Sequence, residues 1–359
     1  MSLDRLREWM EVAGVRAAYL TEPISIGYLT GFRSDPHERL MALVVRPADA
    51  TLIVPGLDEE AARVARGVEV RAWRDGQDPW AVVSDALATF GSGGRVAVDK
   101  DHLSLTAWER LWVVTDGAEP VDAGRQVRLL RARKAPWELE LLGRAAEVTD
   151  QVTERVLAGL AVGSSELEVA MTIDLHIAEA GAQRAFEALV QSGPNSALPH
   201  GRPGDRRLGP GDLVLLDFGA AWQGYRGDTT RMAVVGAPDA RHLEVHSVVL
   251  AAHDAAVATV RAGATAGEVD EAARAVIRAA GLGDRFIHRV GHGLGLEAHE
   301  DPSLDPGSDV VLEEGMVVTV EPGVYVPGWG GVRIEDDVVV EAGGGRLLTA
   351  ANRELRVVD

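Results

Sequence analysis

The 359-residue chain has no cysteine. It therefore has no disulfide framework, no thiolate metal site and no cysteine nucleophile. No apolar run approaches the length that crosses a membrane, and segment 1–14 has the pattern of a charged amphipathic helix, unlike a signal peptide. We expect a soluble cytoplasmic protein, because the absence of cysteine fits a reducing compartment.

Positive charge is also scarce. Lys and Arg number 36 against 55 Asp and Glu, which gives a formal net charge of -19. Nucleic acids and anionic membranes attract proteins through a basic surface, so we expect neither as a partner. An acidic surface instead favours cationic ligands, such as the free amino terminus of a peptide.

The length favours two domains. Short helix and strand patterns alternate in residues 1–124, which predicts an α/β domain. The predicted strands are Ala17–Leu20, Met41–Val45, Thr51–Val54 and Arg95–Val98, and the predicted helices are Ser2–Glu11, Ala61–Arg66 and Ala81–Phe90. The pattern breaks at 117–124, which we interpret as a linker. The second domain, 125–359, then opens with a long helix from Pro136 and a second helix over Glu166–Ala180.

The segment Leu213–Arg231 is the first that suggests chemistry. An apolar run carries one acid at Asp217, and a second acid, Asp228, follows a turn. A hairpin turning at 222–223 places these two acids directly opposite each other. Opposed like charges destabilise a hairpin and Asp is a poor strand former, so the pattern suggests a bound cation.

A second hairpin, Met316–Val340, repeats this arrangement. Glu321 follows an apolar strand and Glu335 lies on the returning strand. A turn centred on Gly328 places Glu321 opposite Glu335. Two hairpins that both carry acids hint at a diverged internal duplication.

Two residues lie on these strands beside the acids. Arg333 shares a strand face with Glu335, because side chains alternate along a strand, and Thr230 stands in the same relation to Asp228. We predict that both support the carboxylates from behind.

Between the hairpins lies a histidine-rich segment, His288–Glu300. Three glycines bracket His292, which makes a continuous helix unfavourable and excludes the two-histidine helix of zincins. The other histidines in or near this region are His200, His288 and His299. They are free to bond a tetrahedral intermediate or to donate to a leaving nitrogen.

Each feature alone has an ordinary explanation, since one acid-bearing hairpin is more often a salt-bridged surface element. Together, four acids in apolar strands are costly unless they are paired or bind metal. An oxygen-rich shell with one imidazole suits Mn²⁺, Co²⁺ or Zn²⁺. Four carboxylates can neutralise two divalent cations, so we expect a dinuclear centre.

These residues resemble the five-ligand signature of the creatinase/methionine-aminopeptidase superfamily of dinuclear metallopeptidases. The matching residues are Asp217, Asp228, His292 within HxxGHGxG, Glu321 in VEPG, and Glu335 in GVRIED. The resemblance covers roughly residues 131–340. It implies a pita-bread α/β catalytic domain with pseudo-twofold symmetry.

The extra N-terminal domain is similar to that of the Xaa-Pro branch, aminopeptidase P and prolidase. The K-x-P-x-E-L segment Lys134–Leu139 also resembles the interdomain joint of that branch. The expected substrates are therefore short peptides with proline at the second position, and the family implies a homodimer. The expected cofactor is two divalent ions, Mn²⁺ first, with Co²⁺ or Zn²⁺ as alternatives.

The resemblance also implies roles for individual residues. The five matching side chains would hold the metals, and Glu321 would in addition handle the proton of the nucleophile. His200 and His299 would bind the substrate and stabilise the intermediate. His288 would border the proline pocket, and we count it among the catalytic and substrate-binding histidines.

The choice between aminopeptidase P and prolidase depends on a free carboxylate. A dipeptidase binds that carboxylate beside the reaction centre, usually with arginine. Segment 300–314 contains no Lys or Arg and several acids, so we favour aminopeptidase P with Xaa-Pro dipeptidase as the alternative. A cation from another loop would reverse this choice. The arginines that could supply it are Arg202, Arg206, Arg207, Arg285 and Arg289.

Three other classes are weighed against this interpretation. A metal-free creatinase-like hydrolase and a non-enzymatic binding module on the same fold would both lack the ligand set, which is complete here. Methionine aminopeptidase is the third, but it resembles the catalytic domain alone.

Overall fold

The computed structural model describes residues 2–358, and the chain divides into two compact units between Arg131 and Ala132. Residues 125–131 were expected in the second domain but belong to the first unit, as part of helix α5, Gly124–Ala132. Its side chains Val127 and Leu130 are buried in the core of that unit. This packing explains why the compact unit extends beyond residue 124.

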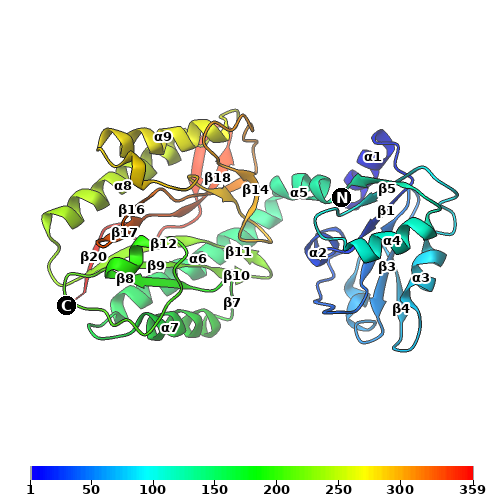
Figure 1. Cartoon of the computed structure of the whole chain (residues 1–359), viewed down its shortest axis with the longest axis horizontal. Helices are drawn as coiled ribbons and strands as arrows, with labels where there is room; N and C mark the ends of the chain where they lie inside the picture. The colour runs from blue at the N-terminus through cyan, green and yellow to red at the C-terminus, as the bar shows by residue number, and fades with distance from the viewer. Residues whose placement is uncertain (1, 359) are drawn as a thin grey trace. The chain divides into compact units, whose positions relative to one another are not determined.

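The first unit is built on one mixed six-stranded sheet with the order β4-β3-β2-β1-β5-β6 (Figure 1). Its strands are β1 (Ala17–Leu20), β2 (Ala42–Val45), β3 (Ala50–Pro55), β4 (Glu69–Trp73), β5 (Arg95–Val98) and β6 (Glu119–Asp122). Its helices are α1 (Ser2–Val12), α2 (Pro23–Thr30), η1 (Ala61–Val64), α3 (Pro79–Ala86), α4 (Leu105–Val114) and α5.

Alternate strand residues build two cores on opposite faces of this sheet. Ala18 and Leu20 pack with α1, α2 and α5, whereas Ala17 and Tyr19 pack with α3 and α4. The predicted α/β architecture is confirmed. The predicted linker at 117–124 is wrong in part, because it contains the edge strand β6, where a proline is tolerated.

The second unit contains two related halves. One half has the sheet β20-β12-β9-β8, and the other has the sheet β14-β13-β15-β18-β19. The strands of the first half are β7 (Gln183–Arg184), β8 (Leu189–Ser192), β9 (Leu213–Phe218), β10 (Ala220–Trp222), β11 (Tyr225–Arg226) and β12 (Thr229–Val235). Those of the second half are β13 (His292–Gly293), β14 (Glu300–Ser303), β15 (Val317–Val320), β16 (Gly323–Val326), β17 (Gly330–Arg333), β18 (Asp336–Glu341) and β19 (Gly344–Leu347). The final strand, β20 (Arg356–Val358), joins the first sheet beside β12.

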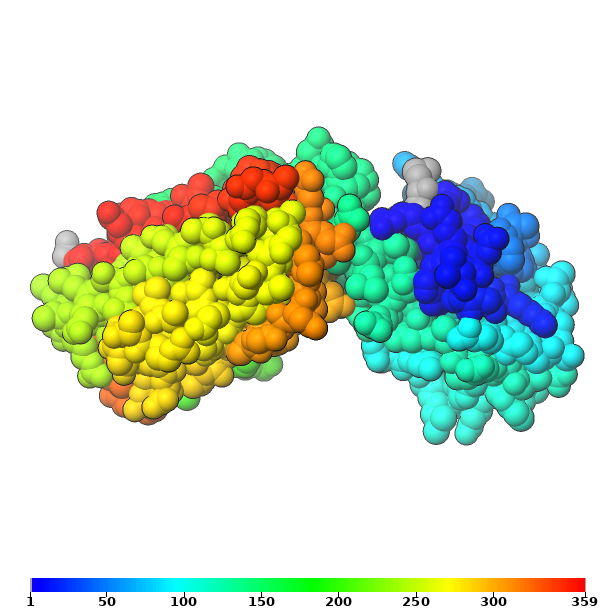
Figure 2. Space-filling view, turned by 90° about the horizontal axis from the view of Figure 1, so that it is seen from above, coloured from blue at the N-terminus to red at the C-terminus, as the bar shows by residue number. Residues whose placement is uncertain are grey.

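A pair of helices packs against each of these sheets. The helices are α6 (Pro136–Gly159), α7 (Glu166–Glu179), α8 (Ala240–Thr259) and α9 (Ala266–Ala279), with short 3-10 turns η2 (Gly193–Ala197) and η3 (Gly283–Arg285). Figure 1 shows α6 and α7 on one side of this unit and α8 and α9 on the other. The space-filling view shows α8 and α9, in yellow-green and yellow, as a continuous outer face (Figure 2).

The two halves repeat local chemistry as well as architecture. Helix α7 begins with a capping box formed by Ser165 and Glu168, and α9 begins with the same device formed by Thr265 and Glu268. The N-cap residue of each helix also makes an isolated antiparallel bridge to a loop of its own half. The predicted pseudo-twofold arrangement is therefore confirmed. No helix within residues 2–358 is both long enough and apolar enough to cross a membrane.

Candidate metal centre and peptide-binding cavity

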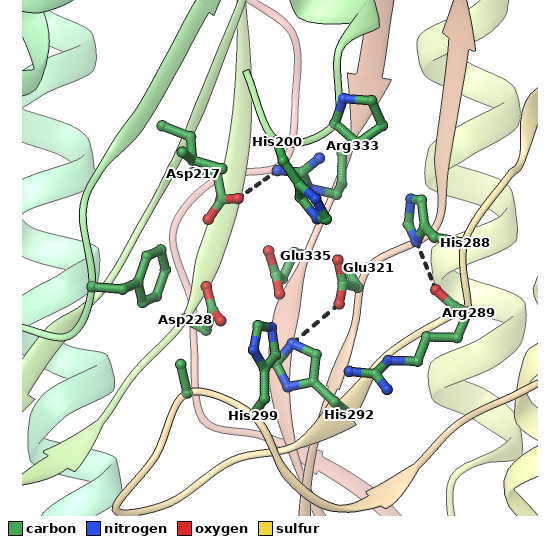
Figure 3. A pocket seen from close by; sticks show the side chains of 14 residues that line it. His200, Asp217, Asp228, His288, Arg289, His292, His299, Glu321, Arg333 and Glu335 are labelled. Atoms are coloured by element: carbon green, nitrogen blue, oxygen red, sulfur yellow. Dashed lines mark hydrogen bonds and ion pairs between the residues drawn. The ribbon is translucent and has the colours of Figure 1, made fainter. Parts of the chain in front are cut away.

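A cavity of about 420 Å³ lies in the second unit, and the predicted side chains converge on it (Figure 3). Its lining consists of Phe186, Leu189, Pro199, His200, Asp217, Asp228, His288, Arg289, His292, Ala298, His299, Glu321, Arg333 and Glu335. Every predicted site residue except Thr230 is in this set. The predicted residues, far apart in sequence, thus meet in one place.

The first hairpin supplies two carboxylates, but its register differs from the prediction. Asp217 pairs with Thr230, and the turn lies at Gln223–Gly224, two positions that both have positive φ. The prediction that Asp217 lies directly opposite Asp228 is therefore wrong. A two-residue hairpin turn of this kind needs two left-handed residues, which Gln223–Gly224 supplies and 222–223 does not.

The second hairpin has the predicted register. Gly323 pairs with Arg333 on one side of the acids, and Val320 pairs with Asp336 on the other. Glu321 and Glu335 occupy the matching positions between these two paired segments. An isolated bridge between Thr230 and Glu335 joins the two hairpins. It brings the carboxylates of both halves to the same cavity.

Three side chains already have the spacing of a metal site. Ligand atoms of Asp228, His292 and Glu335 lie within 4.8 Å of one another, and all three residues are buried. One oxygen of Asp217 and one of Asp228 are buried without a hydrogen-bond partner in the part of the chain described. Buried carboxylate oxygens without donors fit divalent cations, because such oxygens otherwise carry an uncompensated desolvation cost.

The electrostatics agree with this fit. Burial, reinforced by the neighbouring acids, raises the pKa of Asp228 and the pKa of Glu335 well above their ordinary values. Burial also raises the pKa of Asp217, although Arg333 opposes the rise. These acids repel one another when ionised, so the cluster lacks positive charge that bound cations would supply.

His292 is oriented toward these carboxylates. Its Nδ1 lies 3.1 Å from the carbonyl oxygen of Gly293, which can only accept, so Nδ1 carries the proton. The other nitrogen, Nε2, lies 3.2 Å from Glu321 Oε1. Burial acts to raise the pKa of Glu321, but the hydrogen bond and charge of His292 outweigh it and lower that pKa to about 2. Nδ1 keeps its proton whether or not the ring is charged, and Nε2, which faces Glu321, is the nitrogen that would bind a cation once it is unprotonated.

Thr230 and Arg333 each contact a carboxylate, but in neither case the acid beside it on its own strand. The Thr230 hydroxyl donates to Glu335 Oε2 at 2.6 Å. Arg333 donates through Nη2 to Asp217 and through Nε to Thr230 Oγ1 at 3.0 Å. Arg333 therefore holds one carboxylate directly and a second one through Thr230.

His288 has partners on both of its ring nitrogens. Nδ1 lies 2.7 Å from the carbonyl oxygen of Arg289, and Nε2 lies 3.0 Å from the hydroxyl of Tyr325. The carbonyl can only accept, so Nδ1 is protonated and Nε2 accepts from Tyr325, whose oxygen accepts from Arg333 at 2.8 Å. His288 thus presents a ring to the cavity and has no free donor in this structure.

Tyr325 was not predicted as a site residue. Its burial raises its pKa to about 12, so the hydroxyl stays protonated and able to donate. The sequence carries no clear signal for it, because Glu321 lies between β15 and β16 whereas Tyr325 lies in β16, so the alternation of side chains along one strand does not relate them.

His299 and His200 complete the cavity. The ring of His299 lies edge-on to that of His292, with the centroids 4.2 Å apart. Burial, together with His292 and Arg289, lowers the pKa of His299 to about 4, so the ring is neutral near pH 7. His200 lines the opposite side on an exposed loop after η2 (Figure 3).

Of the five arginines that could bind a substrate carboxylate, Arg289 is the one that lines the cavity. Its Nη1 donates to Ser303 Oγ at 2.7 Å. Arg206 is committed to Asp212 through two bonds of 2.8 Å. The other three are surface residues: Arg202 pairs with Glu187, Arg207 with Glu168, and Arg285 lies in η3.

Comparison with known proteins agrees with this geometry. Residues 140–342, which contain all five proposed ligands, match metallopeptidase family M24, and residues 3–133 match the creatinase/prolidase N-terminal domain. The chain belongs to metallopeptidase family M24. Its two compact units correspond to these two matched regions.

Relatives within the family span the whole chain. An Xaa-Pro dipeptidase from Lactobacillus helveticus is 36% identical over 364 residues, covering 100% of this chain and 99% of that protein. The crystal structure of a dipeptidase from Pyrococcus horikoshii OT3 matches with a TM-score of 0.94 and 38% identity, covering 100% of both chains. An X-Pro aminopeptidase from Thermotoga maritima MSB8 matches with a TM-score of 0.89 and 30% identity, covering 98% of this chain and 100% of that one.

Proposed function

We propose that this M24 metallopeptidase is an Xaa-Pro dipeptidase. The observation that carries the proposal is Arg289, a guanidinium in the wall of the cavity beside His299. The dipeptidase names of relatives at 36% and 38% identity support it. The preference for aminopeptidase P rested on a segment without cations, 300–314, and a neighbouring loop now provides the cation.

Arg289 is suited to a free carboxylate. A guanidinium presents a planar set of donors that matches a carboxylate with two parallel hydrogen bonds. Nη1 contacts an uncharged hydroxyl, that of Ser303, so this contact does not neutralise the guanidinium. A dipeptide places its carboxylate directly after the proline, and therefore close to the reaction centre.

The five ligands proposed for two divalent cations are Asp217, Asp228, His292, Glu321 and Glu335. The set is rich in carboxylate oxygen with one imidazole, which favours Mn²⁺, with Co²⁺ or Zn²⁺ as alternatives. When bound, such cations polarise the scissile carbonyl and activate water. Thr230 and Arg333 orient the ligands by hydrogen-bonding their carboxylates, Thr230 that of Glu335 and Arg333 that of Asp217.

The remaining residues act on the peptide. Glu321 is ionised, because its pKa is held low, and its carboxylate would accept a proton from the attacking water. His200 and His299 donate hydrogen bonds to the substrate carbonyl and to the tetrahedral intermediate. His288 forms the wall of the proline pocket, because both of its nitrogens already have partners. Homodimer formation and a cytoplasmic location stay predictions.

The test compares an Xaa-Pro dipeptide with the corresponding Xaa-Pro tripeptide. Wild-type protein loaded with Mn²⁺ is expected to have the higher kcat/KM on the dipeptide. Arg289→Met is expected to lower kcat/KM for the dipeptide by about 10²-fold, because a charge-assisted bond to a carboxylate contributes about 1.5–3 kcal/mol. The tripeptide, which lacks a carboxylate at that position, is expected to change less than about threefold.

Arg202→Met is the matched control, because Arg202 is exposed and does not line the cavity. It is expected to leave both substrates unchanged. Faster turnover of the tripeptide by the wild type would instead support aminopeptidase P, the activity named for the Thermotoga relative. Equal losses on both substrates in Arg289→Met would contradict the role of Arg289 in carboxylate recognition.

A further inference from the structure

The segment Lys134–Leu139 has a role that its resemblance to a domain joint does not explain. The two charged residues of the K-x-P-x-E-L pattern are buried, and they are Lys134 and Glu138. Their contacts lie within the second unit, and both lead to the loop 293–300, which follows His292 and carries His299.

Lys134 makes the direct contact. Its Nζ lies 3.1 Å from Glu300 Oε2, and the exposed fractions of the two side chains are 1% and 4%. Nζ also donates to the carbonyl oxygen of Ala132 at 3.2 Å. The other oxygen of Glu300 accepts the backbone N–H of Glu297 at 3.1 Å, so the carboxylate organises its own loop.

The loop is folded tightly around this carboxylate. A Cβ at Gly295 would lie 2.6 Å from Glu300 Oε2, so only glycine fits there without displacing the ion pair. A Cβ at Gly293 would lie 2.2 Å from the carbonyl oxygen of Asp301. The glycines of this motif therefore permit the close approach of the loop to Glu300, in addition to exposing His292.

Glu138 supports the same loop indirectly. The hydroxyl of Tyr225 donates to Glu138 Oε1 at 2.7 Å. The next residue, Arg226, donates its backbone N–H to the Gly295 carbonyl at 2.9 Å and its Nε to the Leu296 carbonyl at 3.0 Å. Loop 293–300 is thus held on one side by Lys134 and on the other by the tip of the first hairpin.

His299 depends on this loop for its place. Within residues 2–358 its ring contacts the ring of His292, but no hydrogen bond holds it. Its neighbour Glu300 is the residue that Lys134 holds. A shift of the backbone at Glu300 therefore moves the imidazole of His299 relative to the cavity.

We propose that Lys134 is a positioning residue for His299, acting through its buried ion pair with Glu300. The inference rests on the proposed function, in which His299 donates to the intermediate. Removal of the pair is expected to lower kcat more than it changes KM or metal binding. A misplacement of about 1 Å at a catalytic group lowers the rate by about 10²-fold.

The experiment compares Lys134→Met with the matched control Arg133→Met in the full chain. Arg133 is the preceding residue, and its ion pair with Glu313 at 3.0 Å is half exposed. Lys134→Met is expected to lower kcat on an Xaa-Pro dipeptide by about 10²-fold, with KM within about threefold of wild type. Metal content, measured by mass spectrometry after Mn²⁺ loading, is expected to stay unchanged. Arg133→Met is expected to match wild type in all three.

A second readout does not need turnover. In the metal-free protein labelled with ¹⁵N-histidine, the ring signals of His299, assigned with His299→Gln, are expected to shift in Lys134→Met and to stay in place in Arg133→Met. If the wild type cleaves neither dipeptide nor tripeptide, the proposed function fails. The ring signals then still decide whether Lys134 positions His299.

Two further variants cover the case in which Lys134→Met does not fold. Glu300→Gln keeps the shape of the side chain but removes its charge, and is expected to shift kcat in the same direction. Lys134→Arg keeps the charge, and is expected to recover part of the lost kcat, because a guanidinium also pairs with a carboxylate. The proposal would be overturned if, in Lys134→Met or Glu300→Gln, the His299 ring signals did not move and kcat stayed within about threefold of wild type. A loss of kcat that only follows a loss of metal would overturn it as well.

Discussion

Buried acids have opposite surroundings in the two units of the molecule. Among described residues 2–131, Asp99 is the one buried acid, and backbone N–H groups of Thr21 and Glu22 donate to it at 2.7 and 2.6 Å. In the second unit, Asp228 has an oxygen with no partner and lies against other acids. Burial raises the pKa of both groups, but donors oppose the rise at Asp99 and neighbouring carboxylates increase it at Asp228.

This difference separates a structural acid from a functional one. A buried carboxylate that accepts several hydrogen bonds is satisfied within the fold. A cluster of buried acids with unpartnered oxygens is not, and its cost is offset only when a cation binds or when the acids keep protons. The buried acid of the first unit is therefore satisfied by hydrogen bonds, whereas the second unit keeps a cluster of acids that is unfavourable without its metals.

The largest expected effect is at Asp228. Asp228→Asn is expected to abolish metal occupancy and lower turnover by more than about 10³-fold, because a proposed ligand loses its charge. The same change is expected to stabilise the metal-free protein at pH 8 by about 1–3 kcal/mol, because it removes a buried charge that lacks a donor. Metal analysis, steady-state kinetics and thermal unfolding with a chelator measure the three effects.

The gain in metal-free stability is the sharper half of this prediction. A purely structural acid would give a loss in both forms of the protein. Wild-type metal content or activity in Asp228→Asn would remove Asp228 from the ligand set, and it would reopen the metal-free hydrolase as an alternative.

The sequence was informative about the site because acids are rare in apolar strands. Glu321 and Glu335 could be placed opposite each other, since the left-handed turn residue between their strands is the glycine expected there, Gly328. The first hairpin was misread because one of its left-handed residues is Gln223, which carries no such signal. Local chemistry thus predicts the register around Gly328 but not around Gln223–Gly224, where glutamine takes one of the two left-handed positions.

Contacts that depend on tertiary structure could not be predicted. Arg289 was one of five arginines with equal standing, and only the packing of its loop places it in the cavity. Helix α2 was missed because it is apolar on every side and shows no helical periodicity. The contact between Lys134 and Glu300 joins residues 166 positions apart. Nothing in the local pattern of either residue indicates the other.

The second prediction concerns pH. The raised pKa values of Asp228 and Glu335 mean that the folded metal-free protein keeps protons that the unfolded chain releases near pH 4. This contribution to stability is fully present below pH 4 and is lost as the pH rises through the raised values. These two acids are therefore expected to make the metal-free protein less stable as the pH rises above about 4. The slope is at most about 1.4 kcal/mol per pH unit for each proton.

The metal-loaded protein is expected to show no such fall, because cations replace protons at the carboxylates and bind more tightly at higher pH. Thermal unfolding across this range, with chelator and with Mn²⁺, measures the difference. Asp228→Asn is the control, and it is expected to flatten the metal-free slope. Parallel slopes with and without metal would show that the raised pKa values and the metal site are unconnected.

The smallest expected effect lies in the first unit, where Asp99→Asn makes the same chemical change at a buried acid. An amide oxygen can still accept from the N–H groups of Thr21 and Glu22, so only the contact of the second carboxylate oxygen with the Thr21 hydroxyl is altered. The variant is expected to lose about 1 kcal/mol of stability, the net contribution of one hydrogen bond.

Metal content and kcat of Asp99→Asn are expected to equal those of wild type, and the loss of stability is expected to be the same with chelator and with Mn²⁺. Thermal unfolding of both forms tests this directly. The sign of the change in unfolding free energy then distinguishes the two units. Asp→Asn is expected to destabilise the fold at Asp99, where hydrogen bonds satisfy the acid. It is expected to stabilise the metal-free fold at Asp228, where other acids surround the carboxylate. A metal-dependent effect at Asp99 would end that distinction, because it would show that the first unit also responds to the cations.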